Sequence, residues 1–334
     1  ATAVAAALNT ANAAAGTADA GLLSTGSSLT LNTLATVAQA IGVADYATET
    51  KGLYTISGLS YSISDTVTAI AAGIAGIDGA GVTGAVTIAA NNTTAMTVAN
   101  ATTLTSLANF VGYDDPGTAA VVETNYYLSD DFVNLMGGDV ALIAGATTVT
   151  ATGTTGDDTI NLSMHSRGMT IDAGTGADTI TGTSAADTFV FAANDSLEAK
   201  MDTITDFTVA DDTLDVASTD VTVAIASGAG VDVKGAIASG GGAETVTAIV
   251  TNGIVTLEGV DAGDIDTLAE WIDVLEIGLV VADDDNAAFE FGGDTYFFQD
   301  NTSATGGHDI IKLTGVTGIT AIDTTAAANT LLIA

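Results

Sequence analysis

The chain has 334 residues and a formal net charge of −36, from 5 basic and 41 acidic side chains. A protein that binds a phosphate backbone needs clustered Lys and Arg, so this charge excludes nucleic acid as a partner and makes an anionic lipid surface an implausible one. Cysteine is absent, which excludes disulfides and thiolate metal sites; any metal site must use oxygen ligands, with His165 and His308 the only imidazoles.

Small and aliphatic residues dominate the rest of the composition. Hydrophobic residues make up 47% of the chain, aromatic residues only 5%, and there are 38 glycines, which favours closely stacked strands and tight turns over disorder. Polar residues interrupt every apolar run, so no transmembrane segment is predicted. No basic region precedes the Ala-rich start, so no signal peptide is predicted, and a start at Ala1 suggests a processed or truncated product.

Residues 1–50 predict an Ala-rich, mostly helical segment, and residues 51–150 alternate short strands with short helices. Within the second region, residues 61–70 recur as residues 126–135, and each copy reads as a strand followed by a helix that starts at Ser-Asp. The serines of these pairs, Ser64 and Ser129, are the expected helix caps. The repeat predicts duplicated α/β modules, each followed by a β-like segment.

Residues 151–216 carry the most specific pattern. The nonapeptide G-G-x-G-x-D-x-U-x, in which U is apolar, builds a parallel β-roll. It is matched in part at residues 153–160, 173–180 and 182–189, each of which ends in Asp-Thr and an apolar residue. A degenerate copy is expected at residues 162–168. Alternate copies stack on the same side of such a roll, so the first two turns should lie on one edge and the third on the other.

These turns predict a calcium site, because glycine lets carbonyl oxygens point at a cation and the aspartates add carboxylates. Ca²⁺ accepts six to eight oxygen ligands, whereas Mg²⁺ keeps its waters. Without metal the stacked carboxylates repel one another, so cation binding and folding should be coupled. The alternative is a set of ordinary Gly/Asp turns in a β-rich protein. The candidate ligands in the turns are Gly153, Gly156, Asp157, Asp158, Asp172, Gly174, Gly176, Asp178 and Asp187.

On these residues the chain resembles the RTX (repeats-in-toxin) family of type I secreted proteins. The segment after the turns strengthens the resemblance, with D-T-F-V-F at residues 187–191, D-T-I-T-D-F at 202–207 and D-T-L-D-V at 212–216. In the family this segment closes the roll and some of its acidic residues bind calcium, which adds Asp202 and Asp206 as secondary candidates. The chain has only two or three good repeats, so one to three calcium sites are expected.

Residues 217–334 predict a β-rich domain of alternating strands, with one helix at residues 262–277 that holds Trp271, the only tryptophan. Its end, with F-E-F-G-G-D-T-Y at residues 289–296, D-I-I-K-L-T-G at 309–315 and a terminal L-L-I-A, looks like the C-termini of S-layer proteins exported by type I systems in alphaproteobacteria such as Caulobacter. That resemblance implies an uncleaved C-terminal secretion signal. The alternative is that this C-terminal stretch consists of ordinary antiparallel strands without a secretion signal.

The sequence thus predicts a mainly β protein: a short calcium-binding β-roll and a C-terminal β-rich domain, preceded by α/β modules and a helical N-terminus. The expected function is a secreted, calcium-dependent, self-assembling cell-surface protein of the S-layer kind. Its expected partner is itself, with a cell-surface polysaccharide as a further candidate. No catalytic motif is present, so no enzyme is expected. An RTX adhesin or biofilm-matrix protein is the alternative, and a secreted hydrolase the weakest candidate.

Overall fold

The computed structural model describes residues 62–76, 87–90, 95–107, 110–113, 126–216, 231–232, 247–259, 262, 265–278, 286–300, 308–323 and 330–333. Two compact units divide the chain: one comprises residues 1–129 and 145–148, the other residues 130–144 and 149–334. The predicted helical segment 1–50 lies outside the described residues. None of the described helices is long and apolar enough to cross a membrane.

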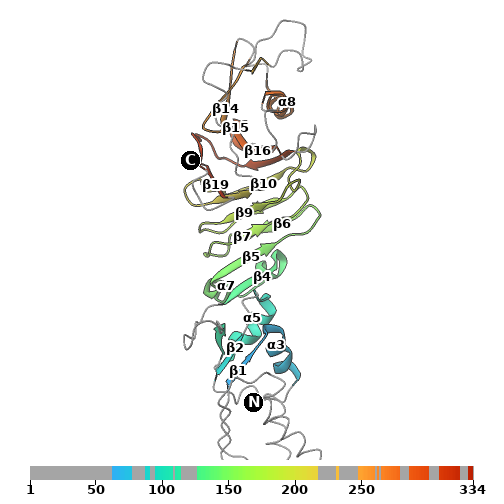
Figure 1. Ribbon diagram of the computed structural model, residues 1–334, viewed down its shortest axis with the longest axis vertical. Helices are drawn as coiled ribbons and strands as arrows, with labels where there is room; N and C mark the ends of the chain where they lie inside the picture. Colours follow the sequence, from blue (N-terminus) through green and yellow to red (C-terminus); the bar gives the residue numbers. More distant parts are fainter. Residues whose placement is uncertain are drawn as a thin grey trace, which may run out of the picture. The chain divides into compact units, whose positions relative to one another are not determined.

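The first unit contains a three-stranded parallel sheet with the order β1-β2-β3. Its elements follow one another in a βαβαβ order (Figure 1): β1 (Ser62–Asp65), α3 (Val67–Gly76), β2 (Thr87–Ala90), α5 (Val98–Thr105) and β3 (Phe110–Tyr113). Parallel strands need crossover connections, and α3 and α5 provide them. The strand–helix order predicted for the first repeat copy is therefore correct.

The predicted helix caps are wrong. The Thr66 hydroxyl accepts a hydrogen bond from Ala69 N at 3.2 Å, so Thr66 and not Ser64 caps α3. In the second copy β4 (Tyr127–Asp131) runs one residue further, so Asp131 takes the cap position of α6 (Phe132–Met136). In both copies the strand extends past the serine, so a later residue takes the cap position.

The second unit contains the predicted β-roll. After α7 (Val140–Gly145), the chain alternates between two parallel sheets. Strands β5 (Thr148–Thr152), β7 (Thr170–Asp172), β9 (Thr188–Phe191) and β11 (Thr213–Val216) form one layer (Figure 1). Strands β6 (Thr159–Asn161), β8 (Thr179–Thr181) and β10 (Asp202–Ile204) form the other. This arrangement confirms a mainly β chain with a parallel roll.

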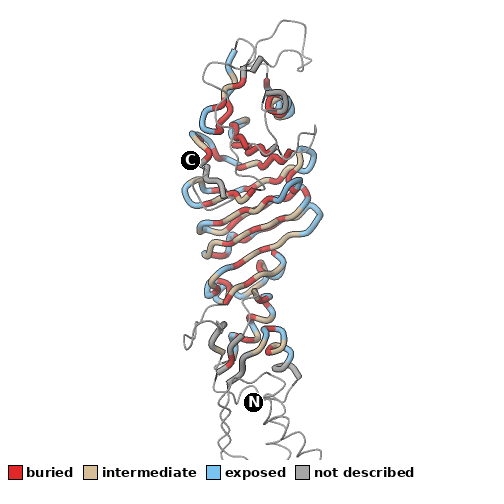
Figure 2. The backbone as a smooth tube through the Cα atoms, viewed as in Figure 1, coloured by how far each residue is buried: buried red, intermediate tan, exposed pale blue. Residues whose placement is uncertain are grey.

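Each strand places at least one buried apolar residue in the space between the two sheets. These side chains are at most 1% exposed: Ala151, Ile160, Ile171, Ile180, Phe189, Ile204 and Leu214. Along each strand of the roll buried residues alternate with intermediate or exposed ones, and the longer exposed stretches lie at the turns (Figure 2). Removing stacked aliphatic rows from water is the main driving force for such a thin core. At one end of the roll α6 packs against β6, and His165 Nε2 lies 3.2 Å from the Leu135 carbonyl oxygen.

The C-terminal strands continue the sheets of the roll. β17 (His308–Leu313) pairs in parallel with β10, and β19 (Thr330–Ile333) pairs antiparallel with β11. The other elements of this region are β12 (Val231–Asp232), β13 (Thr247–Thr251), β14 (Ile254–Glu258), α8 (Leu268–Gly278), β15 (Asn286–Phe291), β16 (Asp294–Asp300) and β18 (Ile322–Asp323). In the roll itself, the short helix η1 (Glu198–Lys200) lies in the connection between β9 and β10. One nine-stranded sheet therefore runs from β12 through β17 to β6.

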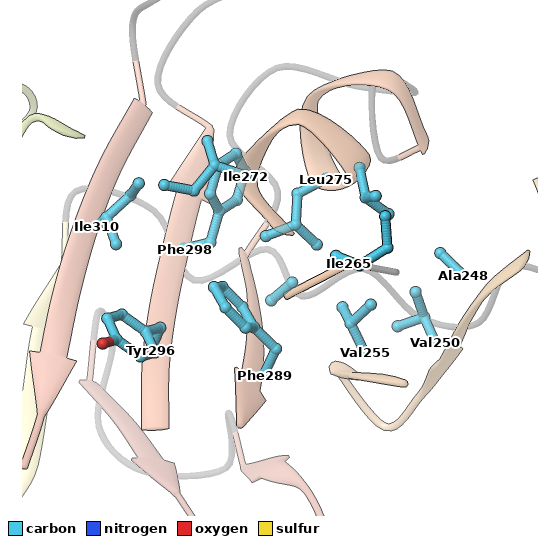
Figure 3. Close-up of a cluster of buried hydrophobic side chains, with 12 residues drawn as sticks. Ala248, Val250, Val255, Ile265, Ile272, Leu275, Phe289, Tyr296, Phe298 and Ile310 are labelled. Carbon is cyan, nitrogen blue, oxygen red and sulfur yellow. The ribbon is translucent and has the colours of Figure 1, made fainter. Parts of the chain in front are cut away.

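A hydrophobic cluster lies between α8 and the C-terminal strands (Figure 3). Phe289 is fully buried, and Trp271 stacks on it with ring centroids 4.9 Å apart. The predicted helix begins later than expected, at Leu268, and Trp271 packs against the core. Asn252-Gly253 and Gly292-Gly293 connect hairpins with positive φ at both residues, which matches the twist of the strands that they join.

Candidate calcium site

The pairing register aligns one repeat position in six strands of the roll; this residue is the first of β10 and directly precedes each of the other five strands. Each position is followed by Thr and an apolar residue: Asp158, Met169, Asp178, Asp187, Asp202 and Asp212. Five of the six are aspartates, and Met169 occupies the position in the predicted degenerate copy. Asp202 and Asp212 are therefore full members of the repeat, whereas the sequence pattern placed them in a closing segment.

The turns of the roll lie on two edges. The connections 153–158, 173–178 and 192–201 lead from the first sheet to the second, and the connections 162–169, 182–187 and 205–212 lead back. The first two predicted turns therefore share one edge and the third lies on the other, as expected. We call the first set edge one and the second set edge two.

On edge one, three aspartates form a carboxylate ladder, which comprises Asp158, Asp178 and Asp202. Asp158 N donates to Asp178 Oδ1 at 2.7 Å, and Asp178 N donates to Asp202 Oδ1 at the same distance. Asp202 N in turn donates to Ser196 Oγ, also at 2.7 Å. The carboxylates of Asp178 and Asp202 thus each accept from the backbone of the neighbouring rung through Oδ1, which aligns the rungs and leaves Oδ2 for another ligand.

In two of the ladder carboxylates, the oxygen that does not bind the neighbouring rung has no hydrogen-bond partner in the part of the chain that the structure describes. Asp178 Oδ2 and Asp202 Oδ2 are buried without a hydrogen bond among the described residues, and their side chains are 1% and 0% exposed. A buried ionised carboxylate without a partner is costly, and a cation is the partner that satisfies it most strongly. The available donors are all oxygens, which fits Ca²⁺ and does not fit a soft metal.

Glycines let the edge-one turns stack closely. A Cβ at Gly153 would overlap the Ala173 carbonyl, and a Cβ at Gly174 would overlap the Thr154 carbonyl. Gly174 also has φ +80°, which strains any other residue. Gly176 lies in the same way against the Gly156 carbonyl. The predicted glycines therefore bring backbone carbonyl oxygens and carboxylates together on one edge.

The ladder carries an unfavourable electrostatic energy without a cation. Burial, together with the charges of Asp178 and Asp195, raises the pKa of Asp202 to about 8. Burial also raises the pKa of Asp178 and of Asp195. A pKa that is higher in the folded state means that the fold loses stability as pH rises from about 4 toward 8, because the folded chain must give up its proton. A bound cation would replace that proton.

The other predicted ligands lie around these turns. Asp157 Oδ1 accepts from Ala177 N at 3.0 Å, and Asp172 Oδ1 accepts from Gly174 N at 3.1 Å, so both stabilise edge-one turns. Asp187 and Asp206 lie on edge two. No group of three or more acidic or His side chains close enough to hold a metal occurs in the described part of the chain. A cation on the ladder therefore needs backbone carbonyls or water among its ligands.

Sequence reasoning missed the residues that cover the top of the ladder. Asp309, from β17, accepts from Asn194 N at 2.9 Å and from Ser196 N at 3.1 Å, and it is fully buried. Ser196 Oγ donates to the Ile310 carbonyl at 2.6 Å. These residues lie more than a hundred positions apart in sequence, and no local motif connects them.

One family comparison bears on this segment. Residues 85–227 match the family model described as Peptidase M10 serralysin C terminal, which covers less than half of the chain but includes all the turns of the roll. The match supports an RTX-type β-roll in this segment. No curated protein matches the chain.

Proposed function

We propose that this chain is a secreted, calcium-dependent, non-enzymatic protein of the cell surface that assembles with copies of itself, as an S-layer subunit does. The observation that carries the calcium part is the pair of buried, unpartnered oxygens Asp178 Oδ2 and Asp202 Oδ2. The family match and the S-layer-like C-terminus support the secretion and surface parts.

The proposed mechanism is a calcium switch. At low calcium, a chain with net charge −36 and a buried carboxylate ladder repels itself and stays loosely folded, which suits export. Outside the cell, Ca²⁺ binds the ladder, and the two sheets close on their aliphatic core. Extracellular modules bind calcium at about 10⁻⁴–10⁻³ M, which suits a protein that folds only after it is released.

Assembly would use the same ion in a second role. A surface with 41 acidic and 5 basic residues repels its own copies unless cations neutralise it. Calcium ions between acidic neighbours would remove that repulsion, so that subunits associate where calcium is abundant. A cell-surface polysaccharide would then be a further partner for attachment.

Sedimentation velocity of the purified chain tests this proposal. We expect large assemblies in millimolar Ca²⁺, and slow, expanded monomers in EDTA or in Mg²⁺ at equal ionic strength. A compact monomer that persists in calcium would contradict the self-assembly and favour the adhesin alternative. Identical sedimentation in all three buffers would contradict the calcium dependence itself.

A further inference from the structure

Three aspartates of the roll are held by a threonine four residues earlier in the same turn. Thr183 N donates to Asp187 Oδ2 at 2.6 Å, while Thr183 Oγ1 donates to Asp187 Oδ1 at 3.0 Å. Thr208 N donates to Asp212 Oδ2 at 2.7 Å. On edge one, Thr154 N donates to Asp158 Oδ2 at 2.7 Å. In each of these Thr-x-x-x-Asp turns, the threonine therefore donates a hydrogen bond to the aspartate of the same turn.

The neighbouring rungs of edge two complete the hydrogen bonding of these carboxylates. Asp187 Oδ1 also accepts from Met169 N at 2.7 Å, and Asp212 Oδ1 accepts from Asp187 N at 2.9 Å. Every carboxylate oxygen of Asp187 and Asp212 therefore has at least one N–H donor. The positive ends of those N–H dipoles stabilise the negative charge of both carboxylates, which is what a cation would otherwise do.

The two aspartates with unpartnered oxygens lack this threonine. Gly174 stands four residues before Asp178, and its N–H donates instead to Asp172 Oδ1. Glu198, in the longer loop 192–201, stands four residues before Asp202. These two rungs are adjacent on edge one, with Thr203 paired to Thr179. Asp195, in the loop above, is 9% exposed, and its charge acts on both carboxylates.

We infer that the roll holds its calcium on edge one only, at the Asp178 and Asp202 rungs, and that the Thr-x-x-x-Asp turns replace the ion on edge two. This inference rests on the proposed calcium function. It makes Thr183 and Thr208 positioning residues, because they fix carboxylates that would otherwise need a cation. Met169 supports this assignment, because it stands on edge two at a repeat position where the other rungs have an aspartate, and it offers no carboxylate to a cation.

A matched pair of variants separates the two kinds of rung. Asp178→Asn and Asp187→Asn change aspartates at the same repeat position, which are 1% and 2% exposed. Isothermal titration of the full chain with CaCl₂ should show affinity lowered by about 100-fold or more in D178N, since the loss of an outer-shell residue alone costs 10–100-fold. Asp202→Asn should weaken the same site, whereas D187N should keep the wild-type stoichiometry and affinity.

Thr183→Ala covers the case in which D187N does not fold, because it removes the Oγ1 contacts with Asp187 and Ala185 but keeps the bond from Thr183 N to Asp187, and it should also leave calcium binding unchanged. If the wild-type chain binds calcium but D187N or T183A binds one equivalent less, the restriction of calcium to edge one is overturned. Unchanged affinity in D178N would overturn the assignment to this rung. An absence of calcium binding in the wild-type chain would instead contradict the proposed function.

Discussion

Replacing Gly174 by alanine is expected to destabilise the roll by about 2–5 kcal/mol, because two penalties combine at this position. The left-handed backbone, with φ +80°, costs a non-glycine residue about 1–2 kcal/mol. The new Cβ would overlap the Thr154 carbonyl of the neighbouring turn, and overpacking of this kind costs about 1–3 kcal/mol or more. Urea unfolding followed by far-UV circular dichroism in saturating calcium measures the loss.

Gly315→Ala is the matched control. Gly315 has φ +72° but no atom within 4 Å of an added Cβ, so only the backbone penalty of about 1–2 kcal/mol applies. A G174A variant that loses no more stability than G315A would show that the turns do not stack as closely as the structure places them.

Asp309→Ala is expected to cost about 1–3 kcal/mol for each N–H donor that it leaves without its carboxylate, because such donors in a buried loop lose their partner without gaining water. The two donors are Asn194 N and Ser196 N. Since Ser196 Oγ accepts from Asp202 N, the loop that covers the ladder should also lose its alignment. Calcium affinity should therefore fall by about 10–100-fold, as it does when outer-shell residues are removed.

Asp294→Ala provides the comparison for a more exposed carboxylate. Asp294 Oδ2 lies 2.8 Å from Lys312 Nζ, and the two side chains are 18% and 27% exposed. Ion pairs at the surface contribute about 0–1 kcal/mol, so D294A should lose little stability and keep its calcium affinity. Equal losses in D309A and D294A would contradict the role assigned to Asp309.

The repeating part of the site could be predicted from sequence because it is local. Glycine, aspartate and an apolar residue at fixed spacing specify a turn, a ligand and a core position, and these placed residues 153–160, 173–180 and 182–189 on the correct edges. The degenerate copy at 162–168 was also predicted, since the repeat length leaves room for one half-turn there.

What was missed depends on contacts between distant segments. The long loop 192–201 disturbs the nine-residue spacing, so the register of Asp202 and Asp212 appears only when their strands pair with β8 and β9. The partnership of Asp309 with Ser196 needs β17 beside β10, which no periodicity encodes. The helix caps failed for a smaller reason: the strand continues through Asp65, which moves the cap of α3 two residues, from Ser64 to Thr66.

Unfolding at two pH values, with and without calcium, tests the central claim that a cation replaces the proton on the ladder. In EDTA, the urea transition seen at pH 5 should move to lower urea at pH 8 or be lost because the chain is already expanded, since the raised pKa of Asp202, about 8, makes its ionisation unfavourable in the fold. With saturating Ca²⁺ the stabilisation should be larger at pH 8, because the ion binds the ionised form. Equal midpoints in EDTA at both pH values, with no gain from calcium, would contradict the account.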